Sequence, residues 1–484
     1  MKNDKYGMDP ARRLFLKSSG IAGLGAFGAL NLLNSEAFAQ QALQAPMNTG
    51  LLGSGHLPAR AKRVIHLHML GAMSHVDTFD YKPVLVERSG QELPPSVKEG
   101  QRISTMSSGQ SAFPIAGPVT GFAQHGQSGA WVSSALPYTA KIVDDLCFIK
   151  TINTEHVNHD PAAKFLFTGF QIAGRPSIGA WVSYGLGSDN RDLPNFVVMK
   201  AGSAGGVPLD SLTWGAGFLP SHHQGVEFLA AEEPVLYIAD PQGLDRRDRR
   251  TMLDSLSRLA QTQYQASGDE ETLSRINQYE MAYRMQASVP EVADISDEPD
   301  YILDMYGPDV RKPGTFARNC LMARRLCERD VKYQLVFSLG WDHHSSIAQS
   351  LPRQCQIIDQ PAAALVTDLK QRGLLEDTLV TFGTEFGRTP FIQGNINDPR
   401  YGRDHHGGAF TWWMAGGGVK AGLTYGETDD FAYNIVKDPV HIHDLNATIL
   451  YLMGVDHKRL TFRAQGRDFR LTDVHGEVVT GILA

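Results

Sequence analysis

Short, mostly apolar runs that alternate with helical stretches constrain the fold of this chain more than any other feature. The runs are five to seven residues long, and most of them end in glycine followed by polar side chains. Alternating strands and helices predict one α/β domain with a largely parallel central sheet flanked by helices. The expected strands are residues 64–70, 195–199, 333–339, 378–382 and 410–415, with 142–149 passing from helix to strand; the expected helices are 162–168, 355–371 and 445–453.

Residues 241–330 differ from the rest in being rich in Arg, Asp, Glu and Gln, with apolar residues at helical spacing. Met252, Leu253, Leu256 and Leu259 show this spacing, which predicts a helical section that covers one side of the sheet. Polar residues that follow the strands of a parallel sheet collect at its carboxyl edge, where ligands bind in such folds. The sequence therefore predicts that the functional site lies among the residues that follow the strands.

Composition limits the class of protein. The 484 residues allow one large domain or several smaller ones, and 42% hydrophobic with 20% charged residues is ordinary for a globular protein. A net charge of −7 argues against nucleic acid or an anionic membrane as the main partner. Four cysteines without a CxxC pair leave open whether they form disulfides or remain buried thiols.

The first forty residues carry the signature of an export signal. Arg12-Arg13 and the residues after them match a twin-arginine motif, a Gly/Ala-rich stretch follows, and Ala37 and Ala39 supply small residues for cleavage. We predict a twin-arginine signal peptide over 1–39, a linker over 40–60 and a single domain over 61–484. A short membrane anchor is the alternative, but the stretch is too short and Gly-rich to span a bilayer well. Recognition by the twin-arginine export machinery implies a periplasmic or extracellular protein without a stable membrane anchor.

Histidine is unevenly distributed along the chain. Of the 17 histidines, eleven fall in five short clusters, which scattered surface histidines would not do. Asp and His clustered at the ends of apolar runs are the donors that a borderline divalent metal prefers. The clusters are His66, His68 and His75; His156 and His159; His343 and His344; His405 and His406; and His441 and His443.

Three of the strand ends offer candidate metal ligands. Asp342 and His344 lie two residues apart on a loop after a predicted strand, so both can point the same way. Asp404 and His405 lie in a polar cluster between glycines, and Glu385 follows a very apolar strand. Imidazoles and carboxylates without thiolates suit Zn, Mn, Fe or Ca better than a structural zinc site. The alternative for each histidine is a hydrogen-bonded core position, and for the glutamate an ion pair with a nearby arginine.

Other residues are candidates for contact with an anion. His159 lies at the start of a predicted helix, where an anion is favoured, so it is a candidate phosphate or sulfate contact, nucleophile or acid. Arg175 and Arg388 are candidates for holding an oxyanion through paired hydrogen bonds. A structural ion pair is the alternative for both arginines.

Several motifs resemble the DUF1501 family of exported proteins, and they look most like a branch abundant in planctomycetes and related bacteria. They lie at residues 67–80, 175–181, 384–390, 402–406, 413–420 and 438–445, and so extend over essentially the whole mature chain. The family is grouped by resemblance with the alkaline phosphatase and sulfatase superfamily. The resemblance implies an alkaline-phosphatase-like α/β fold with one or two metals at the carboxyl ends of the strands.

The resemblance also implies roles for the clustered residues. Asp342 and His344 resemble the Asp and His of the superfamily's first metal, and His405 resembles its late His ligand. Glu385 stands at the position of a ligand Asp, whereas Phe386 stands where a His ligand would be. This chain therefore departs from the superfamily's pattern at one ligand position.

A second departure concerns the nucleophile. Counting back from the Thr-Gly at the end of the following helix places His159 at the nucleophile position, which Ser, Thr or a modified Cys holds in the superfamily. Asp77 lies near the place of the first Asp ligand and is a further candidate metal ligand. His75, Arg175 and His406 are the candidate substrate contacts.

Together these features predict an exported, metal-dependent hydrolase of phosphate or sulfate esters that acts on a small-molecule or glycan ester. In this prediction His159 is the catalytic group and Arg388 steadies the anion. The alternative is a non-catalytic exported binding protein that keeps the fold and binds metal or a sulfated glycan. The departures at Phe386 and His159 favour that alternative.

Overall fold

The structure is a computed structural model that describes residues 50–484, except 100–102, 230–233, 236–244 and 396. The predicted signal peptide and residues 40–49 of the predicted linker lie outside the described part. Residues 50–61 are attached to the domain by backbone hydrogen bonds, such as Leu51 N–H to Tyr184 O at 2.9 Å and Ala61 N–H to Leu452 O at 2.8 Å. None of the helices in the described part has both the length and the apolar composition that a membrane span requires.

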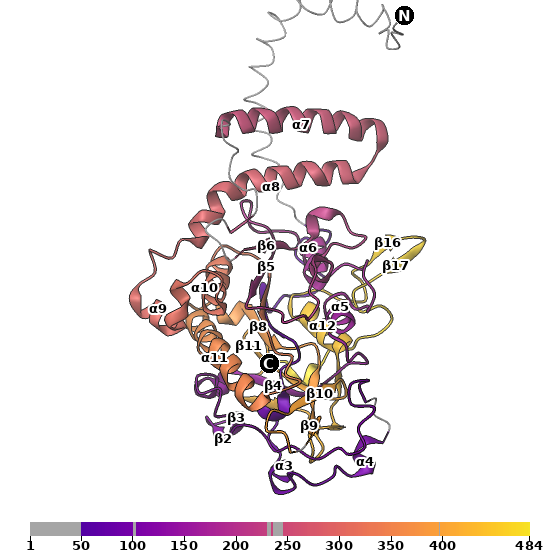
Figure 1. Ribbon diagram of the computed structural model, residues 1–484. Helices are drawn as coiled ribbons and strands as arrows, with labels where there is room; N and C mark the ends of the chain where they lie inside the picture. Colours follow the sequence, from indigo (N-terminus) through magenta and orange to yellow (C-terminus); the bar gives the residue numbers. More distant parts are fainter. Residues whose placement is uncertain (1–49, 100–102, 230–233, 236–244, 396) are drawn as a thin grey trace, which may run out of the picture. The chain divides into compact units, whose positions relative to one another are not determined.

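A nine-stranded sheet forms the centre of the domain (Figure 1). Its middle strand β1 (Arg63–Leu70) pairs in parallel with β7 (Tyr333–Leu339) and β8 (Thr378–Gly383). Among the described strands of this sheet, β11 (Phe410–Ala415) alone runs antiparallel to its neighbours, so the prediction of a largely parallel sheet is confirmed. The order is β12 (Leu423–Tyr425), β4 (Cys147–Asn153), β11, β8, β1, β7, β5 (Phe196–Ala201) and β6 (Val226–Phe228), with β15 (Val440–His441) beside β4.

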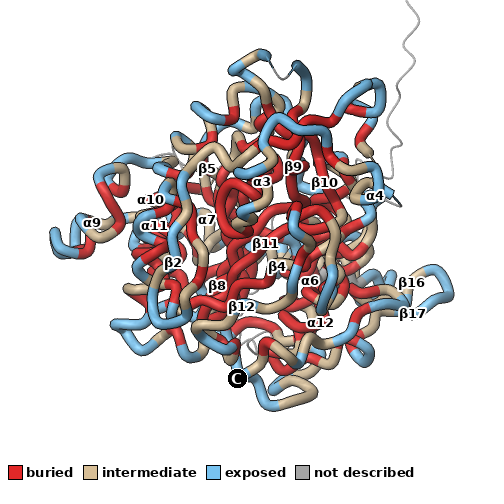
Figure 2. The backbone as a smooth tube through the Cα atoms, turned by 90° about the horizontal axis from the view of Figure 1, so that it is seen from below, coloured by how far each residue is buried: buried red, intermediate tan, exposed pale blue. Residues whose placement is uncertain are grey.

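Helices cover both faces of the sheet, because successive side chains of a strand point to opposite sides. On β1, Ile65, Leu67 and Met69 join one apolar core, whereas Val64 and Leu70 join the other. Figure 2 shows the buried strands at the centre and the exposed loops around them. One face packs against α9 (Asp300–Tyr306), α10 (Phe316–Cys327) and α11 (Ile347–Gln371), and the other packs against α5 (His159–Thr168), α6 (Ile178–Leu186) and α12 (Ile442–Leu452).

The charged section between β6 and β7 contains a helical hairpin. In it, α7 (Arg246–Ser267) packs along α8 (Glu270–Ala293), and α8 joins the core through its C-terminal part, for example Val289 (Figure 1). Leu256 and Leu259, which were expected to face the sheet, are 40% and 68% exposed. The predicted helical section does cover one face of the sheet, but it does so through the C-terminal part of α8 and through α9 and α10, whereas α7 packs against α8.

Two-stranded sheets and short helices surround the central sheet. One of them pairs β9 (Gly387–Gln393) with β10 (Gly402–His406), although no strand was expected over 402–406. All four cysteines are buried and free. The remaining elements are β2 (Phe122–His125) with β3 (Ala130–Ser133), β13 (Glu427–Thr428) with β14 (Ile435–Lys437), β16 (Phe462–Ala464) with β17 (Arg467–Phe469), α3 (Pro83–Glu87) and α4 (Pro95–Lys98).

Candidate metal centre

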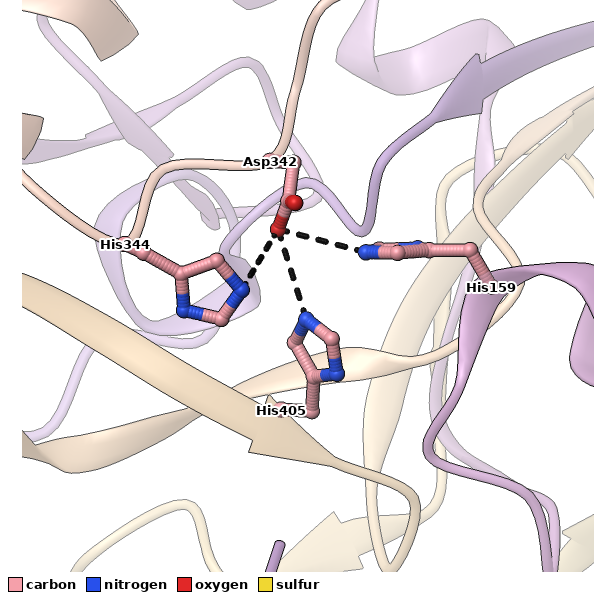
Figure 3. A group of neighbouring side chains, drawn as sticks. All are labelled: His159, Asp342, His344 and His405. Carbon is pink, nitrogen blue, oxygen red and sulfur yellow. Dashed lines mark hydrogen bonds and ion pairs between the residues drawn. The ribbon is translucent and has the colours of Figure 1, made fainter. Parts of the chain in front are cut away.

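Four side chains converge beyond the carboxyl end of β7 (Figure 3). Asp342 and His344 lie on the loop that follows β7, His159 is the first residue of α5, and His405 lies on β10. One donor atom of each lies within 4.8 Å of the donor atoms of the others. Among the residues that the structure describes, this is the one group of His, Cys, Asp and Glu side chains with such an arrangement.

One carboxylate oxygen lies at the middle of the cluster. Asp342 Oδ1 is 3.2 Å from His159 Nε2, 2.9 Å from His344 Nε2 and 3.3 Å from His405 Nε2. His159 Nε2 and His344 Nε2 are buried and make no aligned hydrogen bond. Buried polar atoms are rarely left without a partner, so inward-facing nitrogen lone pairs around a carboxylate fit a divalent cation.

Each imidazole is held from behind through its other nitrogen. His159 Nδ1 lies 2.6 Å from Glu385 Oε1, His344 Nδ1 lies 2.6 Å from Gln393 Oε1, and His405 Nδ1 lies 2.5 Å from the Val157 carbonyl. An acceptor at Nδ1 keeps the proton there and leaves the Nε2 lone pair free. The cluster therefore has the outer hydrogen bonds that metal-binding histidines ordinarily have.

Electrostatics favour a charged carboxylate at the centre. Burial opposes ionisation of Asp342, but contacts with the three imidazoles and the Arg388 charge hold its pKa far below the usual range. Burial also opposes protonation of His159, yet Asp342 and Glu385 raise its pKa above the usual value. Burial lowers the pKa of His405 to about 4, with a partly compensating hydrogen bond to Asp342.

Arg388 lies behind Asp342 rather than in a position to hold substrate. Its Nη2 donates to Asp342 Oδ1 at 2.6 Å and to the Gly71 carbonyl at 2.5 Å. Its Nε and Nη1 donate to the carbonyls of Ala72 and Arg403 at 2.9 Å and 3.0 Å, and the side chain is buried. The expected contact with a substrate anion does not match this position, because the guanidinium is buried and each of its nitrogens already donates to a protein acceptor.

Glu385 lies next to the cluster but outside the set of converging donors. Its Oε1 also accepts the Gly71 N–H at 2.9 Å, and its Oε2 lies 3.2 Å from His68 Nε2. Burial opposes ionisation, but hydrogen bonds from His159 and His68 hold the pKa of Glu385 below its usual range. The structure thus places this predicted ligand behind His159.

Two other predicted ligands lie apart from the cluster. Asp77 is fully buried and accepts two hydrogen bonds from Arg403, at 2.7 and 2.9 Å, and one from the Val119 N–H at 2.9 Å. Asp404 Oδ1 accepts the N–H of His405 at 2.7 Å, and its Oδ2 is buried without a partner. The structure therefore does not bring these two carboxylates to His405 Nε2.

The three predicted substrate contacts also lie apart from the cluster. His75 and His406 are each 1% exposed, and their Nε2 atoms lie 2.9 and 2.7 Å from the carbonyls of Ala432 and Tyr433. Arg175 Nη1 lies 3.2 Å from Asp473 Oδ2, and its guanidinium lies over the rings of Phe170 and Phe469. Substrate could not reach the two histidines without rearrangement of the protein.

The cluster has one closed, apolar side and one side that faces solvent. The Phe386 ring stacks against His159, with centroids 4.8 Å apart, and lies 4.7 Å from the ring of His405. The side chains of Asp342 and His344 are 29% and 20% exposed, whereas those of His159 and His405 are 8% and 5% exposed. An apolar wall thus closes one side, and the Asp342 and His344 side faces solvent.

Sequence reasoning missed the residues behind the ligands. Gln393 and the Val157 carbonyl carry no recognisable sequence signal. His68 belongs to a histidine cluster noted in the sequence, and because His66 and His68 are two residues apart on a strand they share a face, but the sequence assigned His68 no role behind a ligand.

Comparison with known proteins identifies the family. The sequence profile of "Protein of unknown function (DUF1501)" matches residues 61–483, so the chain belongs to that family. A search of curated proteins found no match. Among solved structures, the chain is similar to the lipoteichoic acid synthase LtaP from Listeria monocytogenes, with 9% identity, 86% of this chain and 76% of that chain covered, and a TM-score of 0.38. It is also similar to the sulfatase PsFucS1 from Pseudoalteromonas sp., with 13% identity, 87% of this chain and 70% of that chain covered, and a TM-score of 0.32. A third similar structure is the alkaline phosphatase of the Antarctic bacterium TAB5, with 12% identity, 82% of this chain and 98% of that chain covered, and a TM-score of 0.32.

Proposed function

We propose that this DUF1501 protein binds one divalent transition metal through His159, Asp342, His344 and His405, and that it hydrolyses phosphate or sulfate esters. The observation that carries the proposal is the convergence of three imidazole Nε2 atoms on one carboxylate oxygen, with each imidazole held at Nδ1. Such a donor set, supported from behind, is what metal-binding sites require.

The donor set also limits which metal can bind. Three imidazoles and one carboxylate suit zinc, manganese or iron, whereas calcium takes mainly oxygen ligands. We therefore favour a transition metal over the calcium that the sequence left open.

The residues around the cluster define its chemistry. When bound, a divalent ion supplies Lewis acidity toward a phosphoryl or sulfuryl oxygen and lowers the pKa of a water molecule. The partly exposed side at Asp342 and His344 offers the approach for an ester. His159 acts as a ligand in this proposal rather than as the nucleophile, because Glu385 holds its Nδ1 and its Nε2 faces the cluster.

The substrate class rests on the motif resemblance described above. The strand before Glu385 and the late His405 resemble the metal-binding segments of phosphatases and sulfatases, so an ester of phosphate or sulfate is the substrate we propose. Small-molecule and glycan esters both fit this class.

A second candidate function is non-catalytic metal or sulfated-glycan binding. Two observations favour it: the cluster has four protein donors, the number that a closed structural zinc site uses, and a histidine stands where the resemblance implies a nucleophile. Hydrolysis then requires a fifth coordination position on the exposed side, whereas binding alone does not.

Elemental analysis and an ester-hydrolysis screen test both candidates. We expect about one equivalent of metal in the mature wild type, loss of metal in His344→Ala and His405→Ala, and retention in His343→Ala as a matched control. His343 is the adjacent imidazole and lies outside the converging group. Aryl phosphates and aryl sulfates are the test substrates. Metal without hydrolysis favours the binding protein, and absence of metal from folded wild type refutes both metal-dependent hydrolysis and metal binding.

We also propose export by the twin-arginine pathway, with the mature protein in the periplasm or outside the cell. The support is the Arg12-Arg13 motif and the small residues at Ala37 and Ala39. A fusion of residues 1–45 to a reporter should be exported, and replacement of both arginines by lysine should abolish export. Export that persists in the lysine variant would contradict the pathway.

A further inference from the structure

A buried chain of hydrogen bonds runs from the metal cluster into the central sheet. Beyond His159, Glu385 Oε2 lies 3.2 Å from His68 Nε2, and His68 Nδ1 lies 3.2 Å from His66 Nε2. The chain ends at Thr381, whose hydroxyl lies 2.8 Å from His66 Nδ1. The four residues beyond His159 are at most 2% exposed, so solvent does not substitute for any member of the chain.

The chain has one consistent direction of donation. Glu385 accepts the backbone N–H of Gly71 and the Nδ1–H of His159, so its other oxygen is an acceptor for His68 Nε2–H. His68 Nδ1 must then accept from His66 Nε2–H, and His66 Nδ1 must accept from the Thr381 hydroxyl. Each imidazole therefore has one tautomer that satisfies both of its neighbours.

Packing alone does not account for these two histidines. His66 lies against the rings of Phe167 and Trp412, and His68 lies against Phe167 and Phe337. An apolar aromatic residue would fill the same space without the cost of burying imidazole nitrogens. What the imidazoles add is the hydrogen-bond chain to Glu385.

We propose that His68, oriented by His66, is a positioning residue for the metal centre: it holds the Glu385 carboxylate so that the carboxylate accepts the Nδ1 proton of His159. The His159 Nε2 lone pair then faces the metal. This inference rests on the metal-binding part of the proposed function and is independent of ester hydrolysis.

Zinc affinity, measured by competition with a chromogenic chelator, tests the proposal. His68→Phe should bind zinc about 10–100-fold more weakly, which is the usual cost of losing an outer-shell partner. His68→Gln should stay close to wild type, because a glutamine amide can still donate to Glu385. His457→Phe is the control, because His457 is a buried imidazole bonded to Thr472 and lies outside the chain.

Nitrogen-15 NMR of histidine-labelled, metal-free wild type gives a second readout, with the His159 signal assigned through its loss in His159→Gln. We expect the proton of His159 on Nδ1. A folded His68→Phe with wild-type affinity, or an Nε2–H tautomer at His159, would overturn the proposal. If His68→Phe does not fold, the His159 tautomer and the zinc affinity are measured in His66→Phe instead. The zinc affinity of His66→Phe should also be lower than that of wild type, and an unchanged affinity would overturn the proposal. Wild type that binds no zinc would instead refute the proposed metal site.

The α7–α8 hairpin carries a second, independent inference. A groove of about 210 Å³ runs between the two helices, and its lining includes Leu256 and Leu259 of α7 and Ile276 and Tyr279 of α8. Tyr279 is 52% exposed, and both leucines are also exposed. Within the described part of the chain, this apolar face is not covered.

The charges of the two helices indicate what could cover the groove. Residues 246–267 contain five arginines and two aspartates, a net charge of +3, whereas 270–293 contain four glutamates and two arginines, a net charge of −2. In a two-fold dimer, α7 of one copy would lie against α8 of the other, so that opposite charges meet around the apolar face. We infer that a second copy of this chain covers the groove as an antiparallel four-helix bundle.

Analytical ultracentrifugation of the mature protein tests this inference. Wild type should be a dimer at micromolar concentration, and Leu256→Glu/Leu259→Glu should be a monomer with unchanged metal content. Leu212→Glu is the control, because Leu212 is an exposed leucine outside the hairpin and its variant should remain dimeric. Monomeric wild type, or a double variant that stays dimeric, would overturn the inference; binding of a different protein to a monomeric wild type would do so as well.

Discussion

Replacement of Asp342 by asparagine is the sharpest test of the proposed site, because it removes the central charge and changes little else. Asp342 Oδ1 contacts three imidazole nitrogens at 2.9–3.3 Å, so in the proposed site it is both a ligand and the anion around which the other ligands are arranged. Loss of an outer-shell partner costs about 10–100-fold in metal affinity, and loss of a direct ligand should cost at least the upper value, or about 2.7 kcal/mol.

The same substitution has a separate effect on the metal-free protein. Arg388 donates to Asp342 at 2.6 Å, and a charged hydrogen bond contributes about 1.5–3 kcal/mol. Asparagine keeps an acceptor, and Asp342 is partly exposed, so we expect a loss of about 1–2 kcal/mol after discounting for solvent screening. Urea unfolding in the presence of a chelator measures this loss of folding free energy separately from the loss of metal binding.

The control is Asp404→Asn, because Asp404 is a sequence-predicted ligand that lies outside the converging group. Chelator competition should give Asp404→Asn an affinity close to that of wild type. If Asp342→Asn keeps its affinity while Asp404→Asn loses it, the assignment of the cluster is refuted. If both lose it equally, the site is larger than the four donors proposed.

Further predictions concern stability and metal removal. Arg403→Met should destabilise the protein by about 3–5 kcal/mol in urea unfolding, because buried Asp77 loses its partner, whereas the exposed control Arg400→Met should cost less than about 1 kcal/mol. Burial, aided by the nearby His222, lowers the pKa of His223 to about 3. The unfolded chain therefore takes up this proton first, and stability is lost as pH falls below about 6.5, by up to about 1.4 kcal/mol per pH unit. His223→Gln should flatten the fall in the urea midpoint between pH 6 and 4, and an unchanged slope would contradict the assignment. Chelation should lower Tm in calorimetry, because an ion present at about a thousand times its Kd adds about 4 kcal/mol; identical Tm values with and without chelator would count against a bound metal.

The fold was predictable from the sequence because apolar runs and helical spacing report burial directly. The expected strand at 378–382 became β8, Thr378–Gly383, and the helix expected over 355–371 proved to begin earlier, at Ile347. The surroundings of α7 were not predictable for the same reason. An apolar stripe says that a helix face is buried in some contact, but not whether that contact is the sheet, another helix or another chain.

The candidate site was predictable only in part, because side-chain direction depends on local structure. Residues 402–406 form a strand, so neighbouring side chains point to opposite sides. His405 faces the cluster, whereas Asp404 Oδ1 accepts the N–H of His405 and His406 contacts the Tyr433 carbonyl, although the sequence offered Asp404 and His405 alike as ligands. Asp342 and His344 are two residues apart, and both reach the cluster. The missing information was the presence of a strand at 402–406, which its polar composition concealed.

The surroundings of Asp342 argue for one metal rather than two. A second ion would need further donors beside the first, yet the Phe386 ring lies within 5 Å of the rings of His159 and His405 and offers none. The remaining neighbour of Asp342 Oδ1 is the Arg388 guanidinium at 2.6 Å, a fixed positive charge that would repel another cation. The Glu385 carboxylate already accepts hydrogen bonds from His159 and His68. The phenylalanine at a position where the resemblance implies a His ligand and the buried arginine therefore both favour a single metal in the proposed site.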